Sequence, residues 1–155
     1  MTSSRTIAID QLLPYPPARV WRALTDPDLL ARWLMPNDFQ LKVGHHFTFK
    51  GVPVPKVQFS GIVQCEVLTF EVERSLCYSW ADHSGENDLY TTVTWRLEPE
   101  GQGTHLFLEQ DGFDPAHPLQ HLSYQIMSGG WVRLMRQLGE TLATDNNAVP
   151  TSTSK

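Results

Sequence analysis

Near residue 118 the hydrophobic period of this chain changes from two to about 3.6. From residue 39 to residue 110 apolar and polar residues alternate, whereas beyond Pro118 large apolar residues recur at helical spacing over one broad face. The members of that face are Leu119, Leu122, Ile126, Met127, Trp131, Leu134, Met135, Leu138 and Leu142. A helix over 118–143 would be roughly 39 Å long at 1.5 Å per residue, so it can cover an entire sheet.

The alternating segments predict an antiparallel sheet of about six or seven strands. The first strand is expected over 5–13, where Ile7 and Ile9 alternate with polar neighbours. The others are expected around Phe47 and Phe49 and over 59–67, 76–80, 91–97 and 106–110. Residues 100–103 are expected to form a turn, and 112–118 a loop.

Two short helices are expected after the first strand. Pro17 suits the first turn of a helix, because an N–H in that turn has no partner within the helix. Asp26 is a candidate N-cap for a second helix, with Pro27 in its first position. This order of elements predicts an α+β fold in which the curved sheet wraps around the long C-terminal helix.

The composition is typical of one folded domain with a short tail. The 155 residues are 41% hydrophobic and 19% charged, which provides enough apolar surface for one core. We expect the domain to span 1–143 and the polar residues 144–155 to be disordered. Cys65 and Cys77 show no spacing that favours a bridge, so both are expected as reduced thiols.

Charge and hydropathy bear on partners and location. The net charge is -5 and no basic run occurs, which argues against a nucleic-acid partner. No apolar run is long enough for a membrane span and residues 1–5 do not begin a signal peptide, so we expect no membrane partner and a cytoplasmic location. We further expect no cofactor, and a monomer or a weak homodimer.

Rings, methionines and two polar residues predict a binding site between the sheet and the long helix. The candidates are Trp33, His45, Phe49, Phe59, Trp80, Trp95, Gln110, Met127, Trp131 and Met135. Rigid rings can line an apolar pocket, although the same rings also form ordinary packed cores. The Gln110 amide is expected to bond either to the backbone, which we favour, or to a ligand. His45 has the same two interpretations, with a surface position as a third.

Patterns that indicate catalysis or metal binding are weak. His117 and His121 are spaced i, i+4, but the sequence suggests no third ligand and Pro118 places His117 at the helix start. No nucleophile motif or phosphate-binding loop occurs. We therefore expect no metal site, and the residues alone leave open whether the protein is an enzyme.

Several stretches carry a family resemblance over nearly the whole body of the chain. They are 20–27, 30–33, Val43 and Gly44 with Phe47 and Phe49, 76–80, Gly103 and Thr104 before Leu106 and Leu108, and Gly130 with Trp131. In this order they resemble the activator-of-heat-shock-ATPase-like branch of the START-like, birch-pollen-allergen-like (SRPBCC) superfamily. The resemblance implies a helix-grip fold. His45 and the proline-rich loop 52–55 depart from the branch's pattern.

The resemblance also implies three classes of function. The leading hypothesis is binding of a hydrophobic or aromatic small molecule in a cavity between the sheet and the C-terminal helix. The alternatives are a co-chaperone-like or stress-related domain with a protein partner, and a cyclase- or hydrolase-type enzyme. An exposed apolar groove without a cavity would favour the protein-interaction domain. A cavity with convergent unpaired polar groups would favour the enzyme.

Overall fold

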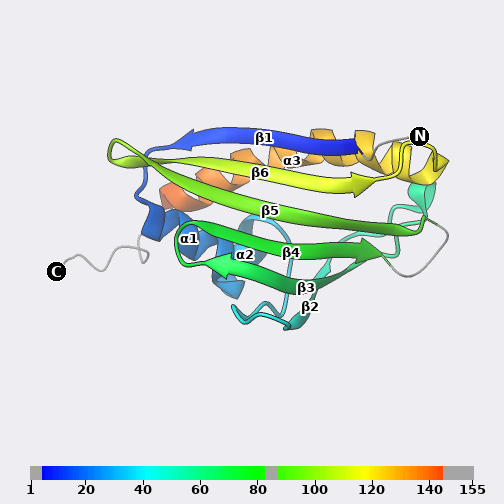
Figure 1. The fold of residues 1–155 in the computed structure, drawn as a ribbon, viewed down its shortest axis with the longest axis horizontal. Coiled ribbons are helices and arrows are strands. Elements are labelled where there is room, and N and C mark those ends of the chain that lie inside the picture. The colour runs from blue at the N-terminus through cyan, green and yellow to red at the C-terminus, as the bar shows by residue number, and fades with distance from the viewer. Residues whose placement is uncertain (1–4, 83–86, 145–155) are drawn as a thin grey trace.

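A six-stranded antiparallel sheet forms one layer of the computed structural model, and the long helix α3 lies along it (Figure 1). The elements are β1 (Arg5–Leu13), α1 (Pro17–Thr25), α2 (Pro27–Trp33), β2 (His46–Lys50), the 3₁₀ helix η1 (Pro55–Val57), β3 (Ile62–Glu71), β4 (Ser75–Asp82), β5 (Leu89–Glu100), β6 (Gly103–Phe113) and α3 (Pro118–Thr144). The strand order β1-β6-β5-β4-β3-β2 and the long final helix confirm the α+β helix-grip arrangement. The structure describes residues 5–82 and 87–144, so the expected tail lies outside the described residues beyond Thr144.

The two short helices begin where the local sequence predicts. Pro17 occupies the first turn of α1, and Asp26 is the N-cap of α2. The Asp26 carboxylate accepts hydrogen bonds from the backbone N–H groups of Asp28 at 2.9 Å and Leu29 at 3.4 Å. These donors have no partner within the helix, so the cap stabilises the start of α2.

Strand register brings the inward-facing residues of neighbouring strands side by side. Leu76 on β4 pairs with Trp95 on β5, and Trp95 pairs with Leu108 on β6. All three side chains are at most 1% exposed. Their neighbours along each strand point to the other face, because side chains alternate across a strand. One face of the sheet therefore supplies the core beneath α3.

Two strand boundaries differ from the sequence expectation. Strand β3 begins at Ile62, so Phe59 and Gly61 precede it. Gly61 has φ +95°, a left-handed conformation that interrupts the extended backbone, and Phe59 makes an isolated bridge with Val54. Strand β6 continues to Phe113 beyond the expected loop boundary. The segment 51–61 consequently folds as an irregular loop around η1 rather than as an extension of β3.

The two ends of the space between sheet and helix are built differently. Helices α1 and α2 lie toward the left in Figure 1, and α1 contacts α2, α3, β5 and β6. Helix η1 and the start of α3 lie toward the right. Within residues 5–82 and 87–144, no helix combines the length and apolar character needed to cross a membrane.

Candidate ligand-binding site

A pocket of about 410 Å³ opens between α3 and the segment that joins β2 to β3. Its apolar walls include Val52, Val54, Val57, Phe59, Val63, Trp80, Leu89, Ile126, Met127, Trp131 and Leu134. Pockets for small organic ligands commonly have volumes of about 300–1,000 Å³ and mainly apolar walls. Size and chemistry both suit an apolar guest.

The structure brings four of the sequence-predicted site residues to this pocket. Phe59, Trp80, Met127 and Trp131 line it. Trp80 and Trp131 are 5% and 1% exposed, so each presents only part of its ring to the pocket. Phe59 and Met127 are half-buried and lie closer to solvent.

The other predicted residues do not line this pocket. Trp33, Phe49, Trp95, Gln110 and Met135 are at most 3% exposed and lie in the core. The sixth residue, His45, is half-buried just before β2, where its Nε2 lies 3.0 Å from the Asp38 carbonyl oxygen and its ring stacks near Phe47.

A chain of rings fills the space beneath the middle of α3. The ring of Trp33 lies 5.8 Å from that of Trp95, and Trp95 lies 5.7 Å from Trp131. Trp131 in turn lies 5.5 Å from Trp80, and Trp80 lies 5.5 Å from Phe49. Edge and tilted contacts at these distances stabilise a packed core. The rings therefore form a solid interior. Trp80 and Trp131 lie at its boundary, and the pocket begins on their other side.

A buried relay of hydrogen bonds holds these two tryptophans in place. The indole N–H of Trp131 donates to Oε1 of Gln110 at 2.7 Å, and Nε2 of Gln110 donates to the Thr91 hydroxyl at 2.9 Å. The Thr91 hydroxyl donates to the backbone carbonyl of Trp80 at 2.9 Å. Gln110 thus meets two side chains, whereas the sequence favoured a backbone partner. The relay ties α3 to β6, β5 and β4.

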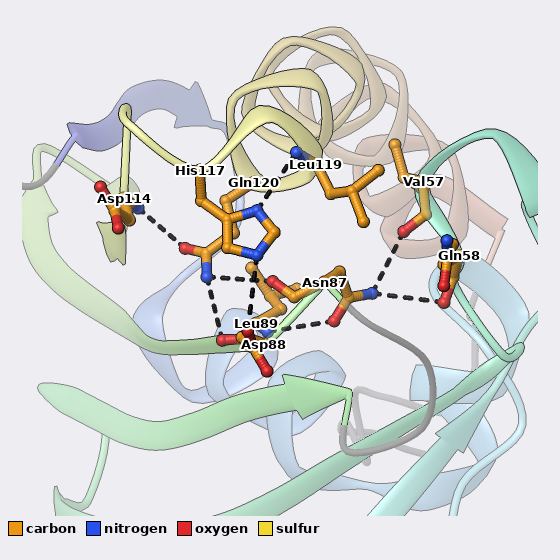
Figure 2. A network of polar contacts seen from close by, with 9 residues as sticks. All are labelled: Val57, Gln58, Asn87, Asp88, Leu89, Asp114, His117, Leu119 and Gln120. Atoms are coloured by element: carbon orange, nitrogen blue, oxygen red, sulfur yellow. Dashed lines mark hydrogen bonds and ion pairs between the residues drawn. The ribbon is translucent and has the colours of Figure 1, made fainter.

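Asn87 fixes the segment at one end of the pocket (Figure 2). Its Nδ2 donates to the backbone carbonyls of Val57 and Gln58 at 3.3 and 3.4 Å, and to Asp82 at 3.1 Å. Its Oδ1 accepts the backbone N–H of Leu89 at 3.0 Å. One side chain therefore connects η1 with the ends of β4 and β5.

Gln120 joins the start of α3 to the same region (Figure 2). Its Nε2 donates to the carbonyl oxygens of Asn87 and Asp88, both at 3.0 Å, and its Oε1 accepts the backbone N–H of Asp114 at 2.8 Å. Gln120 is 6% exposed, so these bonds satisfy a buried amide. The periodicity of α3 gave no signal for Gln120, because its partners are backbone groups from distant segments.

His117, at the start of α3, makes structural contacts. Nδ1 of His117 accepts the backbone N–H of Leu119 at 3.2 Å, and Nε2 lies 3.4 Å from an Asp88 carboxylate oxygen. His117 therefore caps the helix. In the described part of the chain, no group of three His, Cys, Asp or Glu side chains is placed to hold a metal ion.

Two further polar residues line the pocket and were not singled out from the sequence. Ser123 is 5% exposed and reaches the wall near Leu89 and Asn87. Arg133 is exposed at the pocket. A serine and an arginine on a long amphipathic helix are ordinary residues in a sequence, and only the pocket distinguishes them.

Comparison with protein families identifies the relatives of this arrangement. The family model described as "Activator of Hsp90 ATPase homolog 1-like protein" matches residues 14–143. The chain belongs to this family. Membership confirms the branch of the SRPBCC superfamily that the sequence resembles, and family and fold together indicate a ligand-binding fold.

Solved structures similar to this family member come from several bacteria. Protein MLL2253 from Mesorhizobium loti is 35% identical with a TM-score of 0.82, and the match covers 92% of this chain and 99% of that one. CalU16 from Micromonospora echinospora is 27% identical with a TM-score of 0.70, covering 92% and 78%. BH1534 from Bacillus halodurans is 25% identical with a TM-score of 0.73, covering 92% and 99%. A search of curated proteins finds no match to this chain.

Proposed function

We propose that this protein binds a hydrophobic or aromatic small molecule in the pocket between α3 and segment 51–61. The observation that carries the proposal is the apolar pocket of about 410 Å³ beside a solid ring-filled core. An apolar guest gains about 25 cal/mol for each Å² of apolar area removed from water. The relay through Gln110 holds Trp80 and Trp131 in position before a ligand arrives, which lowers the ordering cost of binding.

The placement of polar groups favours binding over catalysis. Among the polar residues of the pocket, Asp82 and Asn87 are engaged in hydrogen bonds with the protein. The backbone positions of Ser123 and Arg133 differ by about 15 Å along α3 at 1.5 Å per residue. General acid–base or nucleophilic chemistry needs groups that converge on one reacting atom. The two groups are better placed to contact opposite ends of a ligand.

The direct test fills the pocket from the helix. A Cβ added at Gly130 meets no atom within 4 Å, and Gly130 lines the pocket, so Gly130→Leu places a side chain in open space. We expect at least a tenfold loss of affinity for an apolar fluorescent probe. The unfolding midpoint should be unchanged or higher, because leucine has a higher helix propensity than glycine. Titration by fluorescence and a thermal melt measure the two quantities.

Gly129→Leu is the matched control. Gly129 is the neighbouring residue on the same helix, is exposed, and does not line the pocket. This variant should keep wild-type probe affinity. Equal affinity in a folded Gly130→Leu protein would remove the pocket as the binding site. Absence of probe binding to the wild type would instead favour the protein-interaction alternative.

A further inference from the structure

The Ser123 hydroxyl makes no hydrogen bond within the described residues. Serines inside helices commonly donate to the carbonyl four residues earlier, as Ser128 does to Tyr124 at 2.7 Å. Ser123 makes no such bond, nor any other side-chain hydrogen bond within residues 5–82 and 87–144, although it is 5% exposed. It lines the pocket. The hydroxyl oxygen is open to the pocket and not sealed in the core, so it is available to a guest.

The neighbouring polar groups are already engaged. Both carboxylate oxygens of Asp82 accept hydrogen bonds, from the backbone and hydroxyl of Ser60 and from Asn87. Asn87 is itself joined to Gln120, one turn before Ser123 on α3. This end of the pocket therefore carries a buried acidic group and one uncommitted hydroxyl. A neutral hydroxyl or carbonyl group of a ligand would find a partner in Ser123.

Arg133 places a positive charge at the solvent-exposed part of the pocket. Its side chain is exposed, and within residues 5–82 and 87–144 it makes no ion pair or hydrogen bond with another side chain or with the backbone. It lies about 15 Å beyond Ser123 along the axis of α3. A guanidinium group matches a carboxylate in both charge and planar geometry. Although the chain carries a net charge of -5, this cation provides a local positive charge that attracts an anionic head group.

Resting on the proposed binding function, we propose that the ligand is an elongated amphipathic carboxylate. Its carboxylate pairs with Arg133 at the mouth, its apolar body lies against Trp80, Met127 and Trp131, and a hydroxyl or carbonyl near its far end bonds to Ser123. Arg133 at one end and Ser123 at the other fix this orientation. The pocket would thus select for both ends of the molecule as well as for its apolar middle.

Three probes of one chain length separate the parts of the proposal. Dodecanol reports the apolar body alone, dodecanoate adds the carboxylate, and ω-hydroxydodecanoate adds a far-end hydroxyl. We expect wild-type affinity at low salt to rise about two- to fivefold from dodecanol to dodecanoate, as for an exposed ion pair. It should rise at least a further fivefold to ω-hydroxydodecanoate, because Ser123 gives the far-end hydroxyl a hydrogen-bond partner inside the apolar pocket. Calorimetric titration below the micellar range measures all three.

Two variants with a control test each end separately. Arg133→Gln should abolish the preference for dodecanoate over dodecanol. Arg136→Gln, which changes an exposed cation on the same helix outside the pocket lining, should retain it. Ser123→Ala should bind dodecanoate more tightly than the wild type and ω-hydroxydodecanoate more weakly. This reversal of sign distinguishes a ligand contact from a general loss of structure, and a thermal melt confirms that each variant is folded.

The outcomes distinguish this inference from the function on which it rests. If dodecanol and an apolar fluorescent probe bind but the wild type shows no preference for dodecanoate, the carboxylate assignment is overturned and the binding function stands. If Ser123→Ala leaves the order of the two acids unchanged, the far-end contact is overturned. If none of the three probes binds, the proposed function fails together with the inference.

Discussion

Trp131 serves both the pocket and the core. Its ring lines the pocket, and its indole N–H donates to Gln110 at 2.7 Å. The sequence placed both residues on the inward face, since Gln110 is in phase with Leu106 and Leu108. It could not show that they meet, because α3 and β6 are brought together only by the folded chain. A polar side chain at an inward position is the signal to search for such a partner.

Trp131→Phe should therefore destabilise the protein by about 1–3 kcal/mol beyond the effect of lost ring volume, because Oε1 of Gln110 is left without its donor. Trp80→Phe is the control, since the Trp80 indole N–H makes no hydrogen bond within the described residues and the volume change is the same. Denaturant unfolding of both variants measures the difference. Equal losses in the two variants would show that the hydrogen bond adds nothing.

Cys65 and Tyr78 make the protein sensitive to alkaline pH. Burial raises the pKa of the Cys65 thiol above its ordinary value of 9.0, with a smaller contribution from Asp38. Burial likewise raises the pKa of the Tyr78 hydroxyl above 10.0. Both groups are uncharged when protonated, and the unfolded chain releases these protons at lower pH than the folded chain. The two protonated groups therefore contribute fully to the free energy of unfolding below pH 9.0, and this contribution is lost progressively as the pH rises above that value.

The free energy of unfolding should fall by about 1.4 kcal/mol per pH unit for Cys65 once the pH exceeds 9.0, and more steeply above 10.0 when Tyr78 joins. Cys65→Ala should lower stability at neutral pH but flatten the decline between these two values. Cys77→Ala, at the half-buried cysteine, serves as the comparison. Denaturant midpoints measured from about pH 8 to about pH 11 follow the decline. A decline as steep in Cys65→Ala as in the wild type would exclude Cys65 as its source.

At the scale of elements, helix boundaries were more predictable than the start of β3. Asp26 and Pro27 act on their immediate neighbours, so the sequence alone located α2. In the sequence Phe59 and Gly61 continue the alternation of β3, but with a left-handed backbone at Gly61 and a bridge from Phe59 to Val54, the strand begins only at Ile62. The alternation of apolar and polar residues shows which side chains share a face of a strand, but it does not reveal the sign of the backbone angle φ. The sequence therefore indicated a loop at 52–55 but not its continuation through residue 61 as one wall of the pocket.

The start of α3 depends on Gln120. Gln120→Leu should destabilise the protein by about 1–3 kcal/mol, because two carbonyl oxygens and the Asp114 N–H lose their partner. Gln125→Leu, at an exposed glutamine on the same helix, should change stability by less than about 0.5 kcal/mol. Hydrogen exchange should quicken at Asp114 in the first variant alone. Unchanged exchange there would mean that the amide does not hold this end of the helix.

At the scale of the whole molecule, the order of elements and the inward faces could be predicted, whereas the extent of the cavity could not. Periodicity identified which rings point inward, including Trp33, Phe49 and Trp95. Whether inward rings leave space depends on the register of six strands and on the height of α3 above them, which are set by contacts between distant segments. The rings fill one end of the space between the sheet and α3, and the pocket remains at the other end.

This division predicts that stability and binding can be altered separately. Trp21 on α1 is 7% exposed and lies outside the pocket lining. Trp21→Ala should destabilise the protein by about 3–5 kcal/mol through the cavity it creates, while the folded fraction keeps its probe affinity. Chemical unfolding and a titration corrected for the folded fraction measure the two effects. A loss of less than about 1 kcal/mol would contradict the role of Trp21 in the core.

The relay through Gln110 also determines how the pocket can adapt to guests of different size. One wall, formed by Trp80 and Trp131, is anchored to the sheet by bonds of 2.7–2.9 Å through buried side chains. The other wall, segment 51–61, is held to the sheet end by bonds of 3.3 and 3.4 Å from Asn87 to the carbonyls of Val57 and Gln58 and by bonds of 3.1 Å from Ser60 to Asp82. If a guest binds here as proposed, a bulkier one should displace the second wall, whose bonds are longer, while the first wall keeps its position. Ligands of one series should share a common pose against the tryptophans and differ only in how far they part the two walls.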